Sequence, residues 1–232
     1  MARIGVVIPA AGQGKRMGAA CNKLFLALAG RPILAHTLAL FEASSQVEEI
    51  VVVGSEEDLA NIRTLIQEYQ IKKVSQVTLG GKERQESVFA GVKALNPAIQ
   101  RVAVHDGARP LLTLEELNRF FTESEEYSAA IMAIPLKDTI KRVDEKGQVL
   151  ETPPRERLRA VQTPQIFERE LLEDAHRQCA IEGFLGTDDA SLVEWLGKPV
   201  QVLDGMLENI KITTPEDLWI AESILKKRLR KR

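Results

Sequence analysis

The stretch from residue 8 to residue 23, IPAAGQGKRMGAACNK, is rich in the residue types that bind phosphates. It continues an apolar, strand-like run at 3–8, and it contains two small residues and a Gly-x-Gly turn at Gly12 and Gly14. The cations that follow are Lys15, Arg16 and Lys23. Glycines let the backbone approach an anion closely, and successive exposed N–H groups in such a turn form a concave anion site. The stretch therefore predicts a loop that binds a nucleoside triphosphate.

Two well-known phosphate-binding motifs do not fit this stretch. A Walker A loop places four residues between its first glycine and Gly-Lys-Ser/Thr, but only one residue separates Gly12 from Gly14. The dinucleotide fingerprint places its third glycine three positions after the second, but Gly18 lies four positions after Gly14. A hydride-transferring dinucleotide enzyme is therefore disfavoured. Taken alone, the stretch is also compatible with a tight strand-to-helix turn that binds no ligand.

A second glycine-containing segment, LGGKERQESVFAGV at 79–92, leads into a predicted helix. Its apolar residues Val88 and Val92 recur on one helical face, together with Leu95. A flexible backbone that feeds a helix N-terminus suits a polar or anionic ligand group. The alternative is an ordinary loop and helix cap.

A third cluster, VHDGARP at 104–110, follows a strand that reads as buried. A carboxylate beside an arginine at the end of such a strand is hard to explain by packing. Asp106 is suited to hold Mg²⁺ or to order its waters, and Arg109 is suited to a substrate phosphate. The alternative is an Asp106–Arg109 ion pair that shapes the loop. We assign no role to His105, because no second metal ligand lies near it in the sequence.

Composition and charge narrow the class of protein. The chain has 232 residues, 44 % of them hydrophobic, and a net charge of −2, so a single large domain is expected and a nucleic-acid partner is not. Cys21 and Cys179 lack metal-ligand spacing and are expected as free thiols in a reducing cytoplasm. No apolar run is long enough to span a membrane, and the N-terminal apolar run is expected to be a first strand rather than a leader.

Short β-branched runs alternate with segments of helical periodicity along the chain. The predicted strands are 4–8, 50–53, 74–79, 102–104, 129–134 and 208–214. The predicted helices are 33–43, 57–69, 86–95, 114–125, 168–182, 189–196 and a last one from Pro215, with Thr214 as its N-cap. The alternation predicts an α/β fold with a Rossmann-like, open, mostly parallel sheet flanked by helices. In such sheets ligands bind beyond the carboxyl ends of the strands.

One segment does not fit a compact sheet. Residues 138–155, DTIKRVDEKGQVLETPPR, read as a β-hairpin with few large apolar residues. An isolated two-stranded hairpin is marginally stable in water, so it packs either on its own subunit or on another. We favour a protruding dimerisation arm, at 137–156, inserted within a single domain that spans 1–232.

The motifs together resemble a known family. The pattern AxGxGxRM followed by Lys23 resembles the signature of nucleotidyltransferases that use sugar or alcohol phosphates. With both glycine loops, the segments HDGARP, DTIKR, VQTPQ, TDDAS and ENIKITTPEDL are similar to the 2-C-methyl-D-erythritol 4-phosphate cytidylyltransferase family, from about residue 4 to 225. Two departures are visible. Asn22 stands where many members have proline, which predicts a less rigid backbone, and Lys82 replaces a common acidic residue.

The resemblance implies a nucleotidyltransferase fold, an activity and a set of site residues. The family joins 2-C-methyl-D-erythritol 4-phosphate to CTP, releasing pyrophosphate, in the non-mevalonate route to isoprenoids. The implied catalytic residues are Arg16, Lys23 and Lys211. The implied CTP-binding residues are Ala10, Ala11, Gly12, Gly14, Gly81, Lys82, Arg84 and Ser87. The implied contacts to the second substrate are Asp106, Arg109, Thr139, Arg155, Thr163 and Thr187.

The resemblance also implies Mg²⁺, bound largely through the CTP phosphates with Asp106 nearby. It implies a cytoplasmic homodimer in which Thr139 and Arg155 reach the neighbouring subunit's site. Two alternatives stay open, namely a ribitol 5-phosphate cytidylyltransferase and a catalytically silent nucleotide-binding subunit. Arg16, Lys23, Asp106 and Lys211 argue against the silent subunit, since binding alone would tolerate the loss of some of them.

Overall fold

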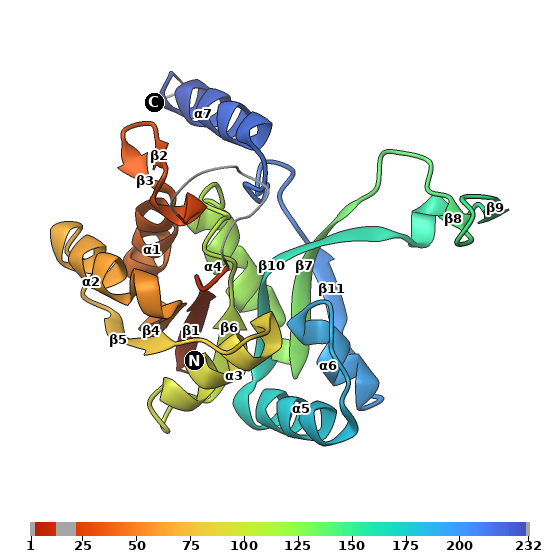
Figure 1. Cartoon of the computed structure of the whole chain (residues 1–232), viewed down its shortest axis with the longest axis horizontal. Helices are drawn as coiled ribbons and strands as arrows, with labels where there is room; N and C mark the ends of the chain where they lie inside the picture. The colour runs from red at the N-terminus through yellow and green to blue at the C-terminus, as the bar shows by residue number, and fades with distance from the viewer. Residues whose placement is uncertain (1–2, 13–21, 231–232) are drawn as a thin grey trace.

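The computed structural model describes residues 3–12 and 22–230. Its centre is a seven-stranded sheet (Figure 1). In spatial order the strands are β11 (Gln201–Asp204), β7 (Ala129–Pro135), β10 (Arg159–Glu168), β6 (Arg101–Val104), β1 (Ile4–Pro9), β4 (Val47–Gly54) and β5 (Val74–Leu79). β10 pairs antiparallel with both of its neighbours, and the other pairs are parallel. The predicted open, mostly parallel sheet is therefore confirmed.

Helices cover both faces of this sheet. The helices are α1 (Ile33–Ala43), α2 (Leu59–Glu68), α3 (Arg84–Ala94), α4 (Leu114–Glu123), α5 (Arg169–Glu182), α6 (Asp189–Trp195) and α7 (Pro215–Leu229). Alternation along β1 sends Val6 and Ile8 into the core shared with α1, α2 and α4, and Val7 into the core shared with α3, α5 and α6. Burial on both faces explains why this strand is apolar without interruption.

Short elements complete the fold. They are the 3-10 turns η2 (Lys23–Phe25), η3 (Glu56–Asp58), η4 (Ser124–Glu126) and η5 (Arg155–Arg157), and the hairpins β2 (Ala27–Leu28) with β3 (Arg31–Pro32) and β8 (Arg142–Val143) with β9 (Val149–Glu151). The predicted hairpin in 138–155 is present as β8 and β9. It follows β7 and precedes β10 in the chain, and it projects away from the sheet (Figure 1). The predicted cap of the last helix is also present, since Thr214 accepts from the Asp217 N–H. Among the described residues, no helix has the length and apolar character needed to cross a membrane.

The predicted strand at 208–214 is wrong. The last strand of the sheet is β11, earlier in the chain, and 208–214 lies outside every strand. Individual hydrogen bonds to neighbouring loops, rather than the ladder of a β-sheet, fix this segment. The Asn209 amide donates to the Thr163 carbonyl at 2.9 Å, and the Ile212 N–H donates to the Ala108 carbonyl at 2.9 Å. The alternation of Ile210, Lys211 and Ile212 therefore reflects a fixed loop beside the pocket described below.

Candidate functional site

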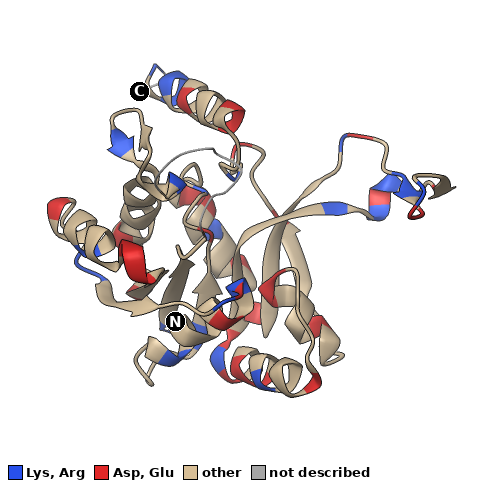
Figure 2. Ribbon diagram, viewed as in Figure 1, with Lys and Arg blue, Asp and Glu red and all other residues tan. Residues whose placement is uncertain are grey.

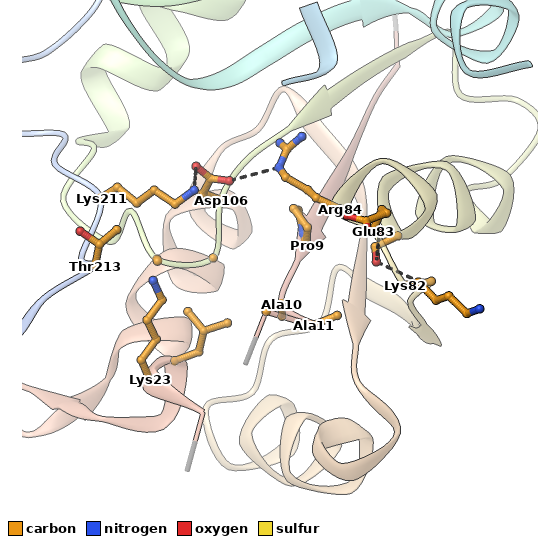
Figure 3. A pocket seen from close by; sticks show the side chains of 16 residues that line it. Pro9, Ala10, Ala11, Lys23, Lys82, Glu83, Arg84, Asp106, Lys211 and Thr213 are labelled. Atoms are coloured by element: carbon orange, nitrogen blue, oxygen red, sulfur yellow. Dashed lines mark hydrogen bonds and ion pairs between the residues drawn. The ribbon is translucent and has the colours of Figure 1, made fainter. Parts of the chain in front are cut away.

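A pocket of about 320 Å³ lies at the carboxyl ends of β1 and β6, where an open α/β sheet binds its ligands (Figure 3). Its lining residues are Pro9, Ala10, Ala11, Gly12, Lys23, Leu24, Gly81, Lys82, Glu83, Arg84, Ser87, Asp106, Gly107, Ala108, Lys211 and Thr213. Every described residue that was predicted to contact CTP is in this set. Gly14 and Arg16, which were also predicted for the site, lie outside the described residues.

The first loop is anchored on both sides of the pocket. The Ala10 N–H donates to the Val53 carbonyl at 2.7 Å, which fixes the exit from β1. The Asn22 amide donates to the Ala10 carbonyl at 3.0 Å and to Asp58 Oδ2 at 2.8 Å. Asn22 Oδ1 also caps η2 by accepting from the Leu24 N–H. Three side-chain hydrogen bonds thus hold Asn22 where a proline would supply none, and they oppose the loss of backbone rigidity that the missing proline predicts.

Two lysines reach into the pocket from segments far apart in the sequence. Lys23, in η2, donates from Nζ to the Ile212 carbonyl at 2.8 Å. Lys211 precedes that carbonyl by one residue, so this hydrogen bond ties the two segments together. Figure 3 shows both side chains pointing toward the space below Asp106, whereas Lys82 extends away from it. The pocket thus places two ammonium groups where a polyphosphate can lie.

The second glycine loop is folded tightly on the first turn of α3. Glu83 is the N-cap, and the Glu83 and Glu86 side chains form a capping box. The Gly81 N–H donates to Ser87 Oγ at 3.1 Å, and the Lys82 N–H donates to Glu86 Oε2 at 2.7 Å. A side chain at Gly81 would collide with Glu86, so only glycine fits there. The Lys82 side chain is exposed and extends away from the pocket (Figure 3), so its charge is not directed at the space that this loop lines.

Asp106 is surrounded by three cations. Its carboxylate lies 3.0 Å from Lys211 Nζ, 3.3 Å from Arg109 Nε and 3.8 Å from Arg84 Nε. Burial raises the pKa of Asp106, but Lys211, Arg84 and Arg109 together outweigh burial and hold this pKa at about 2. The alternative of an Asp106–Arg109 ion pair is therefore present, as one part of a larger cluster. The carboxylate stays charged at neutral pH.

A buried hydrogen-bond chain lies behind Asp106. The Asp106 N–H donates to Thr163 Oγ1 at 3.0 Å, and this hydroxyl lies 3.2 Å from His105 Nδ1. His105 Nε2 lies 3.1 Å from the Arg109 carbonyl, which can only accept, so Nε2 carries the proton and Nδ1 accepts from Thr163. Burial lowers the pKa of His105 to about 4, so the ring is neutral. His105, to which the sequence assigned no role, therefore fixes the Thr163 hydroxyl.

Arg109 and Thr187, which were predicted to contact the second substrate, are not among the residues that line the pocket. Arg109 Nη1 donates to the Asn209 carbonyl at 2.8 Å while Nε faces Asp106. Thr187 is exposed and directly precedes the N-cap of α6, which is Asp188. The segment TDDAS therefore caps this helix through Asp188 rather than through Thr187. Asp188 accepts from the Ser191 N–H at 2.9 Å, which leaves the Thr187 side chain available to solvent.

The arm residues do not reach the pocket of their own chain. Thr139 and Arg155 are both exposed, and Arg155 Nη1 donates to the Lys137 carbonyl at 2.7 Å at the base of the arm. The arm extends away from the sheet and carries charges of both signs (Figure 2). The structure of one chain thus leaves both residues without a place in its own site.

No metal cluster is built into the described part of the chain. Within 3–12 and 22–230, no group of three His, Cys, Asp or Glu side chains is placed to hold an ion. Asp106 and Glu83 are the carboxylates in the pocket lining, and Glu83 caps α3. A divalent cation here would therefore need most of its ligands from a bound molecule.

Comparison with known proteins shows the family to which this chain belongs. A family model described as IspD, 2-C-methyl-D-erythritol 4-phosphate cytidylyltransferase, matches residues 4–227. The enzyme of that name from Halalkalibacterium halodurans is 52 % identical over 226 residues, covering 97 % of this chain and 98 % of that protein. Its namesake from Bacillus mycoides is 50 % identical over 220 residues, covering 95 % of this chain and 96 % of that protein.

Solved structures agree as well. The 4-diphosphocytidyl-2C-methyl-D-erythritol synthase of Anaerococcus prevotii superposes with a TM-score of 0.86 at 32 % identity, covering 97 % of this chain and 96 % of that chain. The 2-C-methyl-D-erythritol 4-phosphate cytidylyltransferase of Thermus thermophilus superposes with a TM-score of 0.79 at 32 % identity, covering 97 % of this chain and 99 % of that one. The resemblance inferred from the sequence motifs is confirmed over almost the whole chain.

Proposed function

This chain belongs to the 2-C-methyl-D-erythritol 4-phosphate cytidylyltransferase family, and we propose that the transfer takes place in the pocket that Lys23, Lys211 and the second glycine loop enclose. The reaction is transfer of a cytidylyl group from CTP to 2-C-methyl-D-erythritol 4-phosphate. A phosphate oxygen of the acceptor forms a bond to the α-phosphorus of CTP. The bond from that phosphorus to the bridging oxygen breaks, and pyrophosphate leaves with the electron pair.

Electrostatic stabilisation and positioning carry this reaction. Two anions must meet, and negative charge builds on the leaving pyrophosphate, so cations aimed at the phosphates lower the barrier. The observation that supports the proposal most is the convergence of Lys23 and Lys211, from distant segments, on a pocket whose rim is glycine backbone. No covalent intermediate on the protein is needed, and direct displacement fits a lining of lysines, arginine and backbone groups.

The nucleoside half of CTP is assigned to the loop from Gly81 to Ser87. Gly81 and Ser87 both line the pocket, and a base edge bound there would share the Gly81 N–H and the Ser87 hydroxyl, which are hydrogen-bonded to each other in the free protein. The triphosphate is assigned to the first loop, with Gly12 at its rim. Arg16 and Gly14, outside the described residues, are proposed to complete this subsite.

Mg²⁺ is proposed to enter with CTP. The ion neutralises phosphate charge when bound, and Asp106 is the pocket carboxylate suited to hold it or its waters. The phosphates would supply most of the ligands, in agreement with the absence of a three-residue metal cluster in the part of the chain that the structure describes. Asp106 stays ionised for this role because its pKa is held at about 2.

The acceptor is assigned to the Asp106 side of the pocket, and Arg109, Thr163 and Thr187, which lie outside the pocket lining, are proposed as its further contacts. We further propose a homodimer in which Thr139 and Arg155 complete the acceptor subsite of the neighbouring chain. Exposed apolar residues on the arm support this: Val143, Val149 and Leu150 are each at least half exposed. A cytoplasmic location is also proposed, and the free, buried Cys179 is compatible with a reducing compartment.

Pyrophosphate release tests this assignment. The enzyme is incubated with CTP and Mg²⁺, with 2-C-methyl-D-erythritol 4-phosphate and ribitol 5-phosphate as parallel acceptors and Lys23→Ala as the comparison. We expect release with the methylerythritol phosphate, and a rate roughly 10²–10³ lower in the variant. Preference for ribitol phosphate would overturn the acceptor assignment, and CTP binding without release from either acceptor would overturn the enzymatic function.

A further inference from the structure

Arg84 is shared between two carboxylates that belong to different parts of the fold. It is the first residue of α3 and it lines the pocket. Its Nη2 donates to Asp189 Oδ2 at 2.8 Å, and its Nε lies 3.8 Å from Asp106 Oδ1. Asp189 is the first residue of α6 and is 1 % exposed. A single guanidinium therefore joins the nucleotide loop, the carboxylate beside the pocket and the start of α6.

A second side chain makes the same connection. Gln85 Nε2 donates to the Phe184 carbonyl at 3.3 Å, and the Gly186 N–H donates to Gln85 Oε1 at 3.1 Å. The first two residues of α3 thus hold the loop that leads to Thr187 and α6. These two hydrogen bonds tie the loop to the first turn of α3.

Gln165, on β10, fixes the other side of α6. Its Oε1 accepts from the Asp189 N–H at 3.2 Å and from the Ala190 N–H at 3.0 Å, and its Nε2 donates to Asp188 Oδ2 at 2.7 Å. Gln165 lies two residues after Thr163. The start of α6 is therefore clamped between α3 and the strand that carries Thr163.

The charge on Asp189 depends on Arg84. Its Oδ1 is buried and has no hydrogen-bond partner among the described residues, whereas its Oδ2 forms the ion pair with Arg84. Burial raises the pKa of Asp189, and Arg84 opposes that shift. Both partners must stay charged for the bridge to persist, since an unpaired buried carboxylate is strongly disfavoured.

We propose that Arg84 and Asp189 are positioning residues that couple the two substrate subsites, so that CTP seated on the second glycine loop raises the affinity of the pocket for the acceptor phosphate. This rests on the proposed function, which puts CTP at Gly81–Ser87 and the acceptor near Asp106 and Thr187. CTP that engages Ser87 and Gly81 acts on the first turn of α3, and the Arg84–Asp189 bridge carries that restraint to α6. By linkage, the acceptor raises the affinity for CTP by the same factor.

Calorimetry with a non-reacting nucleotide tests the coupling. The dissociation constant of 2-C-methyl-D-erythritol 4-phosphate is measured with and without a saturating CTP analogue that has a methylene group between its α- and β-phosphates. For the unmodified enzyme we expect the nucleotide to tighten acceptor binding about tenfold. For Asp189→Asn we expect the factor to fall to within about twofold of unity, and for Asp189→Glu we expect partial recovery. An unchanged factor in Asp189→Asn would overturn the proposal.

The chain offers a matched control and a second variant. The Arg169–Glu173 ion pair, at 2.7 Å, also packs on α3, but it contacts the Val92 and Leu95 carbonyls at the opposite end of that helix. Glu173→Gln should therefore keep the tenfold factor. If Asp189→Asn does not fold, Arg84→Lys serves in its place, because an ammonium cannot span both carboxylates. Retention of full coupling in Arg84→Lys would overturn the proposal.

Turnover is measured in parallel, so that a failure of the proposed coupling can be distinguished from a failure of the proposed function. Pyrophosphate release by the unmodified enzyme with no coupling between the ligands would overturn this inference and leave the proposed function intact. No release with either acceptor would overturn the proposed function, and the inference with it.

Discussion

Lys211 Nζ lies 3.0 Å from Asp106 Oδ2, and this contact joins the loop after β6 to the loop before α7. Asp106 is nearly buried, with 11 % of its side chain exposed, whereas 40 % of the Lys211 side chain is exposed. The carboxylate is thus a fixed anchor, and the ammonium at its open side can turn toward a bound phosphate. Because Arg84 and Arg109 also face the carboxylate, Asp106 keeps its counter-charges when Lys211 engages a substrate.

Replacing Asp106 by Asn should destabilise the protein as well as inactivate it. The change leaves Arg109, which is 12 % exposed, without its carboxylate partner. Removing one member of a buried ion pair costs about 3 kcal/mol, so we expect a clear loss in the free energy of unfolding, measured by urea denaturation. Asp174→Asn is the control, because its ion pair with Arg177 is exposed and should contribute less than about 1 kcal/mol. Equal unfolding midpoints for the two variants would contradict this picture.

Acid should destabilise the fold through two buried histidines. Burial lowers the pKa of His105 to about 4, and burial, aided by Arg84, does the same for His176. The unfolded chain therefore binds more protons than the native chain between pH 6.5 and about 4. The stabilising effect of the neutral rings is complete above pH 6.5 and is lost as the pH falls, by up to roughly 3 kcal/mol for each histidine.

His176→Phe isolates one of these contributions. His176 stacks on Phe89 with ring centroids 5.0 Å apart, and its ring nitrogens have no hydrogen-bond partner among the described residues. A phenyl ring can keep the stacking while it removes the titration. We expect urea midpoints of the variant to fall less steeply than those of the unmodified enzyme between pH 7 and pH 4. Parallel pH profiles would show that His176 is not the source of the acid sensitivity.

Mixing two inactive variants tests whether the arm completes the neighbouring site. Arg155→Ala removes an arm residue, and Lys211→Ala removes a pocket residue. If each site takes its arm from the other chain, mixed dimers contain one intact site. When equal amounts of the two variants are refolded together, about half of the dimers are mixed, and each of these has one intact site out of two. The mixture should then recover about a quarter of the activity of the unmodified enzyme. If the arm served its own chain, neither site of a mixed dimer would be intact, and the mixture would stay inactive.

The sequence predicted well those helices and strands whose residues show a clear hydrophobic periodicity of their own. The helix at 33–43 and the strand at 74–79 have the predicted bounds, because helical periodicity and a β-branched run mark them without tertiary contacts. β10 was not predicted, since the polar residues Gln162, Thr163 and Gln165 interrupt its apolar pattern and it gains its place by pairing antiparallel with β6 and β7. The loop at 208–214 was misread as a strand because Ile-Lys-Ile alternation also suits a loop with one buried face.

In the site, too, the sequence predicted the residues that stand in informative motifs but not those that depend on tertiary contacts. The motif residues Lys23, Asp106 and Lys211 could be predicted because their types and loops are informative in the sequence. Asp189 and His105 could not, because their importance comes from buried contacts to Arg84 and Thr163, which are distant in the chain. A second carboxylate in TDDAS was the available signal for Asp189, but only the fold shows which of the two aspartates faces Arg84.

The central claim, that the pocket at the end of β1 and β6 carries out the transfer, is tested most directly by comparing two lysine variants. Lys211→Ala removes an ammonium that faces Asp106 and the pocket, whereas Lys82→Ala removes an exposed side chain that extends away from it (Figure 3). Steady-state pyrophosphate release with CTP, Mg²⁺ and 2-C-methyl-D-erythritol 4-phosphate should fall roughly 10²–10³-fold in Lys211→Ala. It should stay within about twofold in Lys82→Ala. Equal turnover by the two variants would contradict the assignment of this pocket.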